Sequence, residues 1–128
     1  MAKNKLKSYR IGHFAEVFAA LYLLLKGHRI IKRRYKSPVG EIDLLTMKNK
    51  TLIATEVKFR RTNKHNKSTA EHIFETIHIK NQQRVTRALE YFLSHEPRFH
   101  TYDIRFDAIV IGWPPAIHHL DNAWQTRS

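Results

Sequence analysis

The chain has 128 residues, of which 42% are hydrophobic and 27% are charged, and its formal net charge is +12. This length and composition fit one folded domain over residues 1–128 and argue against intrinsic disorder. The absence of cysteine excludes disulfides and thiolate zinc sites, and the strong positive charge points to a polyanionic partner, with nucleic acid favoured over an anionic membrane.

The first half of the chain predicts one helix and then three strands. Apolar residues from Ile11 to Leu25 recur at helical spacing, which predicts a helix over Ser8–Lys26. Short β-branched or apolar runs between turn residues then predict strands over His28–Tyr35, Glu41–Met47 and Thr51–Phe59.

The second half predicts a helix and two more strands. A polar loop is expected over Arg60–Ser68, and the next helical pattern covers Thr76–Ser94. A strand is expected over Tyr102–Gly112 and a short one over Ala116–Leu120, with an irregular or briefly helical tail. This order favours an α/β class fold, in which a mixed sheet is flanked by two helices.

No stretch of the sequence has the properties of a membrane segment. The longest apolar run falls well short of the ~20 continuous apolar residues that a membrane span needs. The charged start MAKNKLKSYR is not followed by the apolar core of a signal peptide. We therefore expect a cytoplasmic protein that has no membrane partner.

Residues 40–60, GEIDLLTMKNKTLIATEVKFR, place acidic side chains on strands that otherwise look buried. Glu56 and Lys58 lie on one face of their strand because strand residues alternate. Asp43 lies on the neighbouring strand of the predicted hairpin, so the two carboxylates can converge. The alternative is a solvated ion pair between Glu56 and Lys58, but Glu56 interrupts an apolar run, where an ionised group is costly unless it is paired or metal-bound.

A converged pair of carboxylates suits Mg²⁺, with Mn²⁺ as a substitute, because these hard cations prefer oxygen ligands. Such an ion can activate water and neutralise charge on a phosphodiester. Lys58 beside it could stabilise the negative charge that develops during hydrolysis. The residues alone therefore make a metal-dependent nuclease one hypothesis for this protein.

Several ordered motifs resemble the YraN-like family of bacterial proteins. They are Gly12-His13-Phe14-Ala15-Glu16-Val17-Phe18-Ala19, Gly40-Glu41-Ile42-Asp43-Leu44-Leu45, Thr55-Glu56-Val57-Lys58-Phe59-Arg60, Arg105-Phe106-Asp107-Ala108-Ile109 and His119–Ala123. That family belongs to the PD-(D/E)XK nuclease superfamily and is similar to archaeal Holliday-junction resolvases. The resemblance implies a restriction-endonuclease-like fold, in which a mixed central sheet is flanked by helices in a single domain.

The resemblance also implies roles for particular residues. Asp43 and Glu56 would be the metal carboxylates, and Lys58 the catalytic lysine. Glu16 would project from the first helix into the site, as a metal ligand or as a partner of one. The sequence departs from the pattern at Ile42, which replaces the superfamily's proline, at Thr55, where a bulkier apolar residue is usual, and in the polar loop RRTNKHNKS.

Basic side chains near the predicted site are the expected contacts to nucleic-acid phosphates. They are Arg33, Arg34, Arg60, Arg61, Lys80 and Arg84. Tyr9, Tyr35 and Phe59 are interleaved with the basic clusters and could stack on bases. A solvated basic face is the alternative for each cluster taken singly.

Other titratable residues are expected to be structural. Asp107 lies beside Phe106 in a strand, and an ion pair, with Arg105 or with a basic residue of the first helix, is favoured over catalysis. His118 and His119 are adjacent and point to opposite faces of a strand, so a zinc site is not expected.

The sequence thus predicts a metal-dependent endonuclease-like protein that hydrolyses DNA phosphodiesters. Branched or junction DNA is one candidate substrate, and a homodimer is one candidate state. The alternative is a nucleic-acid-binding module whose nuclease site is silent. A third hypothesis is an RNA- or ribosome-associated protein. It is less favoured because no RNA-recognition motif is visible.

Overall fold

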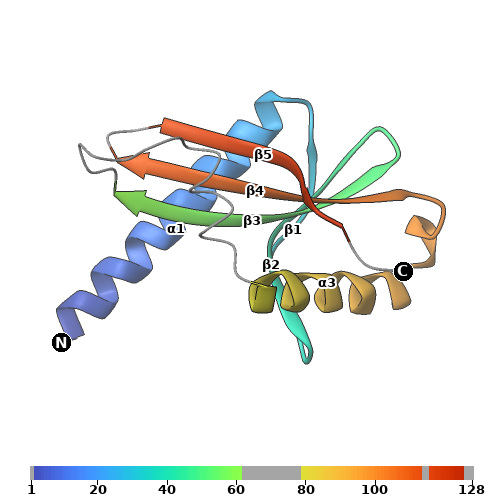
Figure 1. The fold of residues 1–128 in the computed structure, drawn as a ribbon, viewed down its shortest axis with the longest axis horizontal. Coiled ribbons are helices and arrows are strands. Elements are labelled where there is room, and N and C mark those ends of the chain that lie inside the picture. Colours follow the sequence, from blue (N-terminus) through green and yellow to red (C-terminus); the bar gives the residue numbers. More distant parts are fainter. Residues whose placement is uncertain (1, 62–78, 114–115, 126–128) are drawn as a thin grey trace.

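The computed structural model describes residues 2–61, 79–113 and 116–125 (Figure 1). Its elements in chain order are α1 (Ala2–Leu25), β1 (Arg29–Ser37), β2 (Gly40–Lys48), β3 (Thr51–Arg61), α3 (Ile79–Ser94), the 3₁₀ turn η1 (Pro97–Phe99), β4 (Asp103–Trp113) and β5 (Ala116–Trp124). The strands form one five-stranded sheet in the order β1-β2-β3-β4-β5. The β3–β4 pair is parallel and the other three pairs are antiparallel, so the sheet is mixed, as predicted.

The two helices cover opposite faces of this sheet. On β4, Phe106 belongs to the core cluster that α3 completes with Val85 and Leu89. Ile109 and Ile111 belong instead to the cluster that α1 completes through small side chains such as Ala15 and Ala19. Because strand residues alternate between faces, this division places one helix on each side. The described residues therefore form the expected α/β arrangement of a restriction-endonuclease-like fold.

Several element boundaries differ from the sequence prediction, and three of the differences have a clear physical reason. Helix α1 begins at Ala2 rather than at Ser8, because residues 2–7 contain good helix formers and no Gly or Pro. Strand β3 continues through Arg61, since Arg60 and Arg61 still pair with β4 and so are not part of a loop. Strand β5 extends to Trp124, whose ring stacks on Phe106 at a centroid distance of 5.1 Å.

Other predictions fall partly outside the described residues. These include the rest of the polar loop, the first residues of the helix predicted over Thr76–Ser94, and the Pro114-Pro115 break. Within the described residues, no helix is long and apolar enough to cross a membrane.

Gly40 fixes the position of α3 relative to the start of β2. A Cβ atom added at this residue would collide with the backbone carbonyl of Arg84, so the helix backbone lies directly against the strand. The preceding turn is tied by the Ser37 hydroxyl, which accepts hydrogen bonds from the Val39 and Gly40 N–H groups. This close approach brings the N-terminal half of α3 to the carboxylate-bearing end of β2.

Candidate active site

The candidate site forms where the two central strands separate. The pairing of β2 with β3 runs from Lys48 opposite Thr51 to Leu44 opposite Thr55 and ends there. Strand β2 nevertheless starts at Gly40, and β3 continues to Arg61 along β4. The strands therefore diverge at Asp43 and Glu56, the next positions along each, and a cavity opens between them.

At the point where the strands diverge, the side chain of Asp43, rather than the backbone of β2, accepts a hydrogen bond from β3. Its carboxylate Oδ2 accepts a hydrogen bond from the Val57 N–H at 2.9 Å. Burial and the nearby Glu56 carboxylate raise the pKa of Asp43 from 3.8 to about 7, against the opposing effects of the Val57 N–H and Lys58. Asp43 thus lies beside a second carboxylate and has no ion pair of its own among the described residues, which is the condition that a bound cation relieves.

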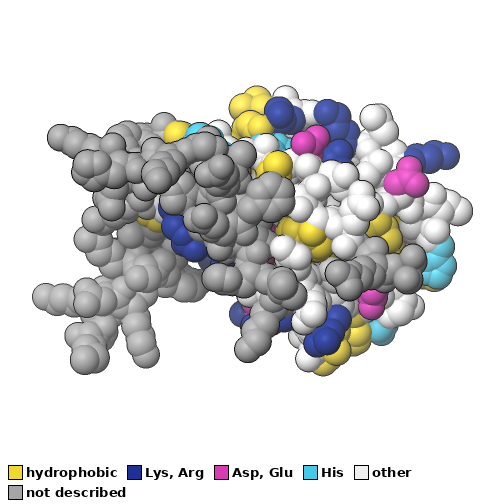
Figure 2. Space-filling view, in the orientation of Figure 1, with side chains coloured by type: hydrophobic (Ala, Val, Ile, Leu, Met, Phe, Trp, Pro, Cys, Tyr) yellow, Lys and Arg dark blue, Asp and Glu magenta, His cyan; other side chains and the backbone are white. Residues whose placement is uncertain are grey.

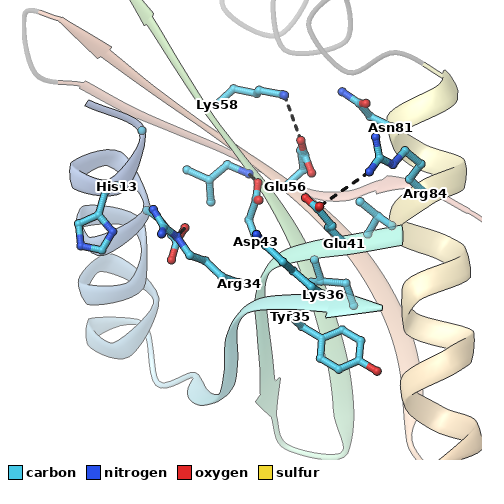
Figure 3. Close-up of a pocket in the computed structure, with 15 residues that line it drawn as sticks. His13, Arg34, Tyr35, Lys36, Glu41, Asp43, Glu56, Lys58, Asn81 and Arg84 are labelled. Atoms are coloured by element: carbon cyan, nitrogen blue, oxygen red, sulfur yellow. Dashed lines mark hydrogen bonds and ion pairs between the residues drawn. The ribbon is translucent and has the colours of Figure 1, made fainter. Parts of the chain in front are cut away.

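Glu56 and Lys58 lie on the same face of β3, as the strand alternation predicted. The Lys58 ammonium is 3.2 Å from Glu56 Oε1 (Figure 3). Glu56 is buried while the Lys58 side chain is 27% exposed, so the ammonium lies at the edge of the cavity. A ligand entering from solvent would meet this cation next to the carboxylate pair.

Glu16 enters the cavity from α1 and is bound by β1. The Arg34 Nε–H donates to Glu16 Oε2 at 2.7 Å, and Arg33 Nε lies 3.8 Å from Oε1. Arg34 has a positive φ of 53°, a backbone conformation that costs free energy for any residue other than glycine. Oε1 of Glu16 is buried and has no hydrogen-bond partner among the described residues, so this carboxylate still has acceptor capacity inside the cavity.

Helix α3 supplies the opposite wall of the cavity. Arg84 Nη2 is 3.8 Å from Glu41 Oε1, and both side chains are exposed. Asn81, one turn earlier on the same helix, also lines the cavity, and His13 lines it from α1 (Figure 3). The sequence analysis did not single out Asn81, because a lone Asn near a helix start carries no functional signal of its own.

The cavity, which we call the acidic pocket, has a volume of about 450 Å³. Four of the chain's eleven acidic residues line it, namely Glu16, Glu41, Asp43 and Glu56. Among the described residues, no three His, Asp or Glu side chains are arranged to enclose a metal ion by themselves. The donor set nevertheless fits Mg²⁺, because this ion binds through one or two carboxylates and keeps several waters.

The predicted phosphate contacts lie in different places. Arg34 and Arg84 line the acidic pocket, where they contact Glu16 and Glu41. Arg33 lies beside Glu16 but does not line the pocket itself. Arg60 is exposed and its guanidinium donates to the Phe59 carbonyl, while the side chains of Arg61 and Lys80 lie outside the described part. On the face drawn in Figure 2, the described Lys and Arg side chains form several separate groups.

Two of the aromatic residues proposed to stack on bases contribute to the core. Tyr35 packs edge-on against Phe92, with ring centroids 5.5 Å apart. Phe59 packs against the cluster beneath α1. Tyr9 has no described side chain. Base stacking at this site therefore lacks an exposed aromatic platform among the described residues.

Asp107 belongs to a separate ion-pair cluster, and its expected partner is confirmed. Arg105 donates to both carboxylate oxygens of Asp107 at 2.8 Å, His119 Nε2 lies 2.8 Å from Oδ2, and the Asn122 N–H donates to Oδ1. Burial alone would raise the pKa of Asp107, but the hydrogen bonds from His119, Arg105 and the Asn122 N–H lower it to about 2.

Comparison with known proteins places this sequence in a family. The model of the uncharacterised protein family UPF0102 matches residues 15–111, which include Glu16, Asp43, Glu56 and Lys58. The chain belongs to the UPF0102 family. This family is the YraN-like group of the PD-(D/E)XK superfamily, so the resemblance noted from the sequence is confirmed.

Curated UPF0102 relatives align over nearly the whole chain. A UPF0102 protein of Parvibaculum lavamentivorans is 37% identical over 123 residues, covering 94% of this chain and 85% of its own. One from Ehrlichia ruminantium is 36% identical over 115 residues, covering 90% and 84%. One from Sinorhizobium medicae is 37% identical over 123 residues, covering 94% and 93%.

Proposed function

We propose that this UPF0102 protein is a metal-dependent endonuclease that hydrolyses DNA phosphodiesters in the acidic pocket. The observation that carries the proposal is the divergence of β2 and β3, which leaves Asp43 and Glu56 side by side with Lys58 in an open cavity. Two neighbouring carboxylates, one buried and one half-buried, are unfavourable for stability alone even with Lys58 beside Glu56. Such an arrangement is typical of a site that binds a cation when it performs its function.

The pocket residues divide the chemistry between them. Asp43 and Glu56 would hold Mg²⁺, or Mn²⁺ in its place, and Glu16 Oε1 offers a further acceptor for a water of the ion. The cation, when bound, supplies charge that polarises the phosphodiester and lowers the pKa of an attacking water. The Val57 N–H orients the Asp43 carboxylate through its hydrogen bond.

Lys58 is proposed to stabilise charge in the transition state. Its ammonium lies 3.2 Å from Glu56 and is partly open to solvent, so a phosphate oxygen that enters the cavity can also contact it. Hydrolysis places an additional negative charge on the phosphoryl oxygens, and a fixed cation at that point lowers the barrier. Lys58 differs from the carboxylates in that metal binding does not require it.

Two features support DNA as the proposed substrate, namely the net positive charge of the chain and the arginine side chains near the pocket. The chain carries a net charge of +12, which favours association with a phosphate backbone and predicts steep salt dependence. Arg34 and Arg84 line the pocket, Arg33 lies beside Glu16, and all three are partly exposed. Branched or junction DNA belongs in the substrate panel beside duplex and single-stranded DNA.

Cleavage of a labelled DNA panel in Mg²⁺ and in Mn²⁺ tests this proposal. Asp43→Asn should abolish metal-dependent cutting, and Lys58→Met should reduce the rate by about a hundredfold or more while retaining metal binding. Matched controls are Asp103→Asn and Lys50→Met, which make the same changes at exposed positions outside the pocket. All variants are purified identically, so that a contaminating nuclease would cut equally in each.

The outcomes separate the proposed enzyme from the alternative. Cutting that disappears in Asp43→Asn and persists in Asp103→Asn would support the nuclease. Equal cutting by Lys58→Met and the parent would contradict the role of that lysine. No cutting by any protein, with tight and salt-sensitive DNA binding that Asp43→Asn leaves unchanged, would favour a nucleic-acid-binding module with a silent site.

A further inference from the structure

Helix α1 buries its small side chains and exposes its large ones. The face against the sheet is built from Ala15, Ala19, Ala20 and Leu23, together with Glu16. The outward side chains include Phe14, 62% exposed, Phe18, 36%, Leu21, 55%, and Leu25, 89%. A helix that is apolar on all sides is normally covered on all sides, so this second face calls for a partner.

The exposed residues have the spacing of a helix-pairing seam. Phe14, Phe18, Leu21 and Leu25 are separated by four, three and four residues, which are successive d, a, d and a positions of a heptad. The rings of Phe14 and Phe18 already stack on each other, with centroids 6.1 Å apart. We call these four residues the α1 seam.

The charge around the α1 seam identifies the kind of partner. Residues 14–25 contain no Lys or Arg, although the chain has 23 of them, and Glu16 lies on the buried face. A helix that lies on an anionic membrane or on nucleic acid carries basic residues along its contact face, whereas the basic residues of α1 are confined to residues 3–10, and the next one is Lys26. A surface strip without positive charge instead favours contact with another strongly basic protein. A second copy of this chain is the simplest such partner.

The spacing of the α1 seam is the same when read in either direction. In an antiparallel pair centred between Ala19 and Ala20, Phe14 lies opposite the partner's Leu25, and Phe18 opposite the partner's Leu21. A surface that matches itself in this way is what a two-fold dimer requires. We propose that α1 pairs antiparallel with α1 of a second copy through the α1 seam.

Antiparallel pairing also separates the most basic segments. The first turns of α1, AKNKLKSYR, carry four Lys or Arg residues. With the proposed centre, this segment of each helix projects beyond Leu25 of the other, whereas parallel pairing would place the two segments together. The repulsion between like charges therefore selects the antiparallel arrangement.

The exposed area is of the right order for a dimer. With Leu24, which is 49% exposed beside the seam, the five side chains present on the order of 500 Å² per copy, compared with about 800 Å² per partner in a standard interface. The remainder would come from the rims of the two helices. The inference does not depend on the proposed nuclease activity, since the α1 seam faces away from the acidic pocket.

The oligomeric state tests the proposal first. Analytical ultracentrifugation over a range of concentrations should show a monomer–dimer equilibrium. Leu21→Glu should raise its dissociation constant by more than about tenfold, because the charge is buried against the partner's Phe18. Ile104→Glu is the matched control, since Ile104 is 48% exposed on β4, outside the α1 seam. Both variants change exposed positions and should keep the parent's circular dichroism spectrum.

Cysteine crosslinking tests the register independently, and the chain's lack of cysteine gives a clean background. Phe14→Cys mixed with Leu25→Cys should form a disulfide-linked dimer on mild oxidation. Either variant alone should crosslink far less, because Cα atoms of linked cysteines lie within about 7 Å and two copies of residue 14 would be about 16 Å apart.

Three results would overturn the proposal. The first is a monomer at every concentration, including one that binds anionic phosphatidylserine vesicles instead. The second is a dimer that Leu21→Glu and Ile104→Glu weaken equally. The third is a Phe14→Cys variant that crosslinks to itself as well as the mixture does.

Discussion

Two carboxylates on this sheet, the buried Asp107 and the half-buried Asp43, have opposite surroundings. Asp107 receives hydrogen bonds from Arg105, His119 and the Asn122 N–H, which lower its pKa to about 2. Asp43 has one hydrogen bond, from the Val57 N–H, and is close to a second carboxylate, and its pKa is raised to about 7. Asp107 is paired with two basic side chains and an N–H group, whereas the described residues give Asp43 one N–H partner and no ion pair.

The difference is the one expected between a structural carboxylate and one that is proposed to bind a cation. The arginine and histidine beside Asp107 come from strands β4 and β5, so this cluster joins the last two strands of the sheet. Asp43 instead lies where two strands separate, facing a cavity of about 450 Å³. Stability explains the first arrangement, and ligand binding is the better explanation of the second.

The largest expected effect on stability is from Asp107→Asn. The change leaves Arg105 and His119 without their anion in a buried setting, and should lower the free energy of unfolding by about 3 kcal/mol. Urea unfolding followed by circular dichroism measures this. Asp103→Asn, an exposed position on the same strand, is the control and should change stability little. A loss no larger than the control's would show that the cluster does not join the strands.

Asp43→Asn should have the opposite effect and raise the free energy of unfolding. The neutral amide removes the repulsion from Glu56 and can still accept the Val57 N–H, so the metal-free protein should gain on the order of 2 kcal/mol at about pH 8. The same unfolding experiment, run in a chelator, measures this gain. Destabilisation by Asp43→Asn would mean that the carboxylate is already compensated.

The gain from Asp43→Asn should also depend on pH. A raised pKa means that the folded state holds the proton more tightly than the unfolded state, so the stability linked to Asp43 is present below pH 3.8 and lost as pH rises through about 7. The difference between the variant and the parent should therefore shrink as pH falls from about 8 to about 5. Unfolding free energies of the two metal-free proteins across this interval measure the effect. A difference that stays constant with pH would refute the raised pKa.

A smaller effect is expected at Thr55, beside Glu56 on β3. Its side chain is fully buried and its Oγ1 has no hydrogen-bond partner. Thr55→Val replaces this hydroxyl with a methyl group of similar size and should stabilise the protein by about 1 kcal/mol, as measured by chemical unfolding. DNA cleavage should be unchanged, because Thr55 does not line the acidic pocket. A loss of stability would reveal a partner for the hydroxyl.

Local pattern was sufficient to predict the strands and the three central residues of the pocket. Alternation placed Glu56 and Lys58 on one face, and hairpin connectivity brought Asp43 near them. The ion pair between Asp107 and Arg105 followed from the same alternation. These features depend on residues close in sequence or on directly adjoining strands.

The remaining features depend on contacts that local pattern does not specify. Beyond the point where β2 separates from β3, Gly40 lies against the backbone of α3, an approach with no local signal beyond one glycine. The pairing of Arg34 with Glu16 depends on a positive φ within a strand. The extension of β5 to Trp124 depends on stacking with Phe106 across the sheet.

Titration of the metal-free protein with Mn²⁺, followed by electron paramagnetic resonance, tests most directly whether the acidic pocket is a divalent-cation site. The account predicts saturable binding that Mg²⁺ competes away, that weakens sharply in Asp43→Asn and that persists in Lys58→Met and Asp103→Asn. Absence of saturable binding by the parent, or equal binding by Asp43→Asn and Asp103→Asn, would contradict it.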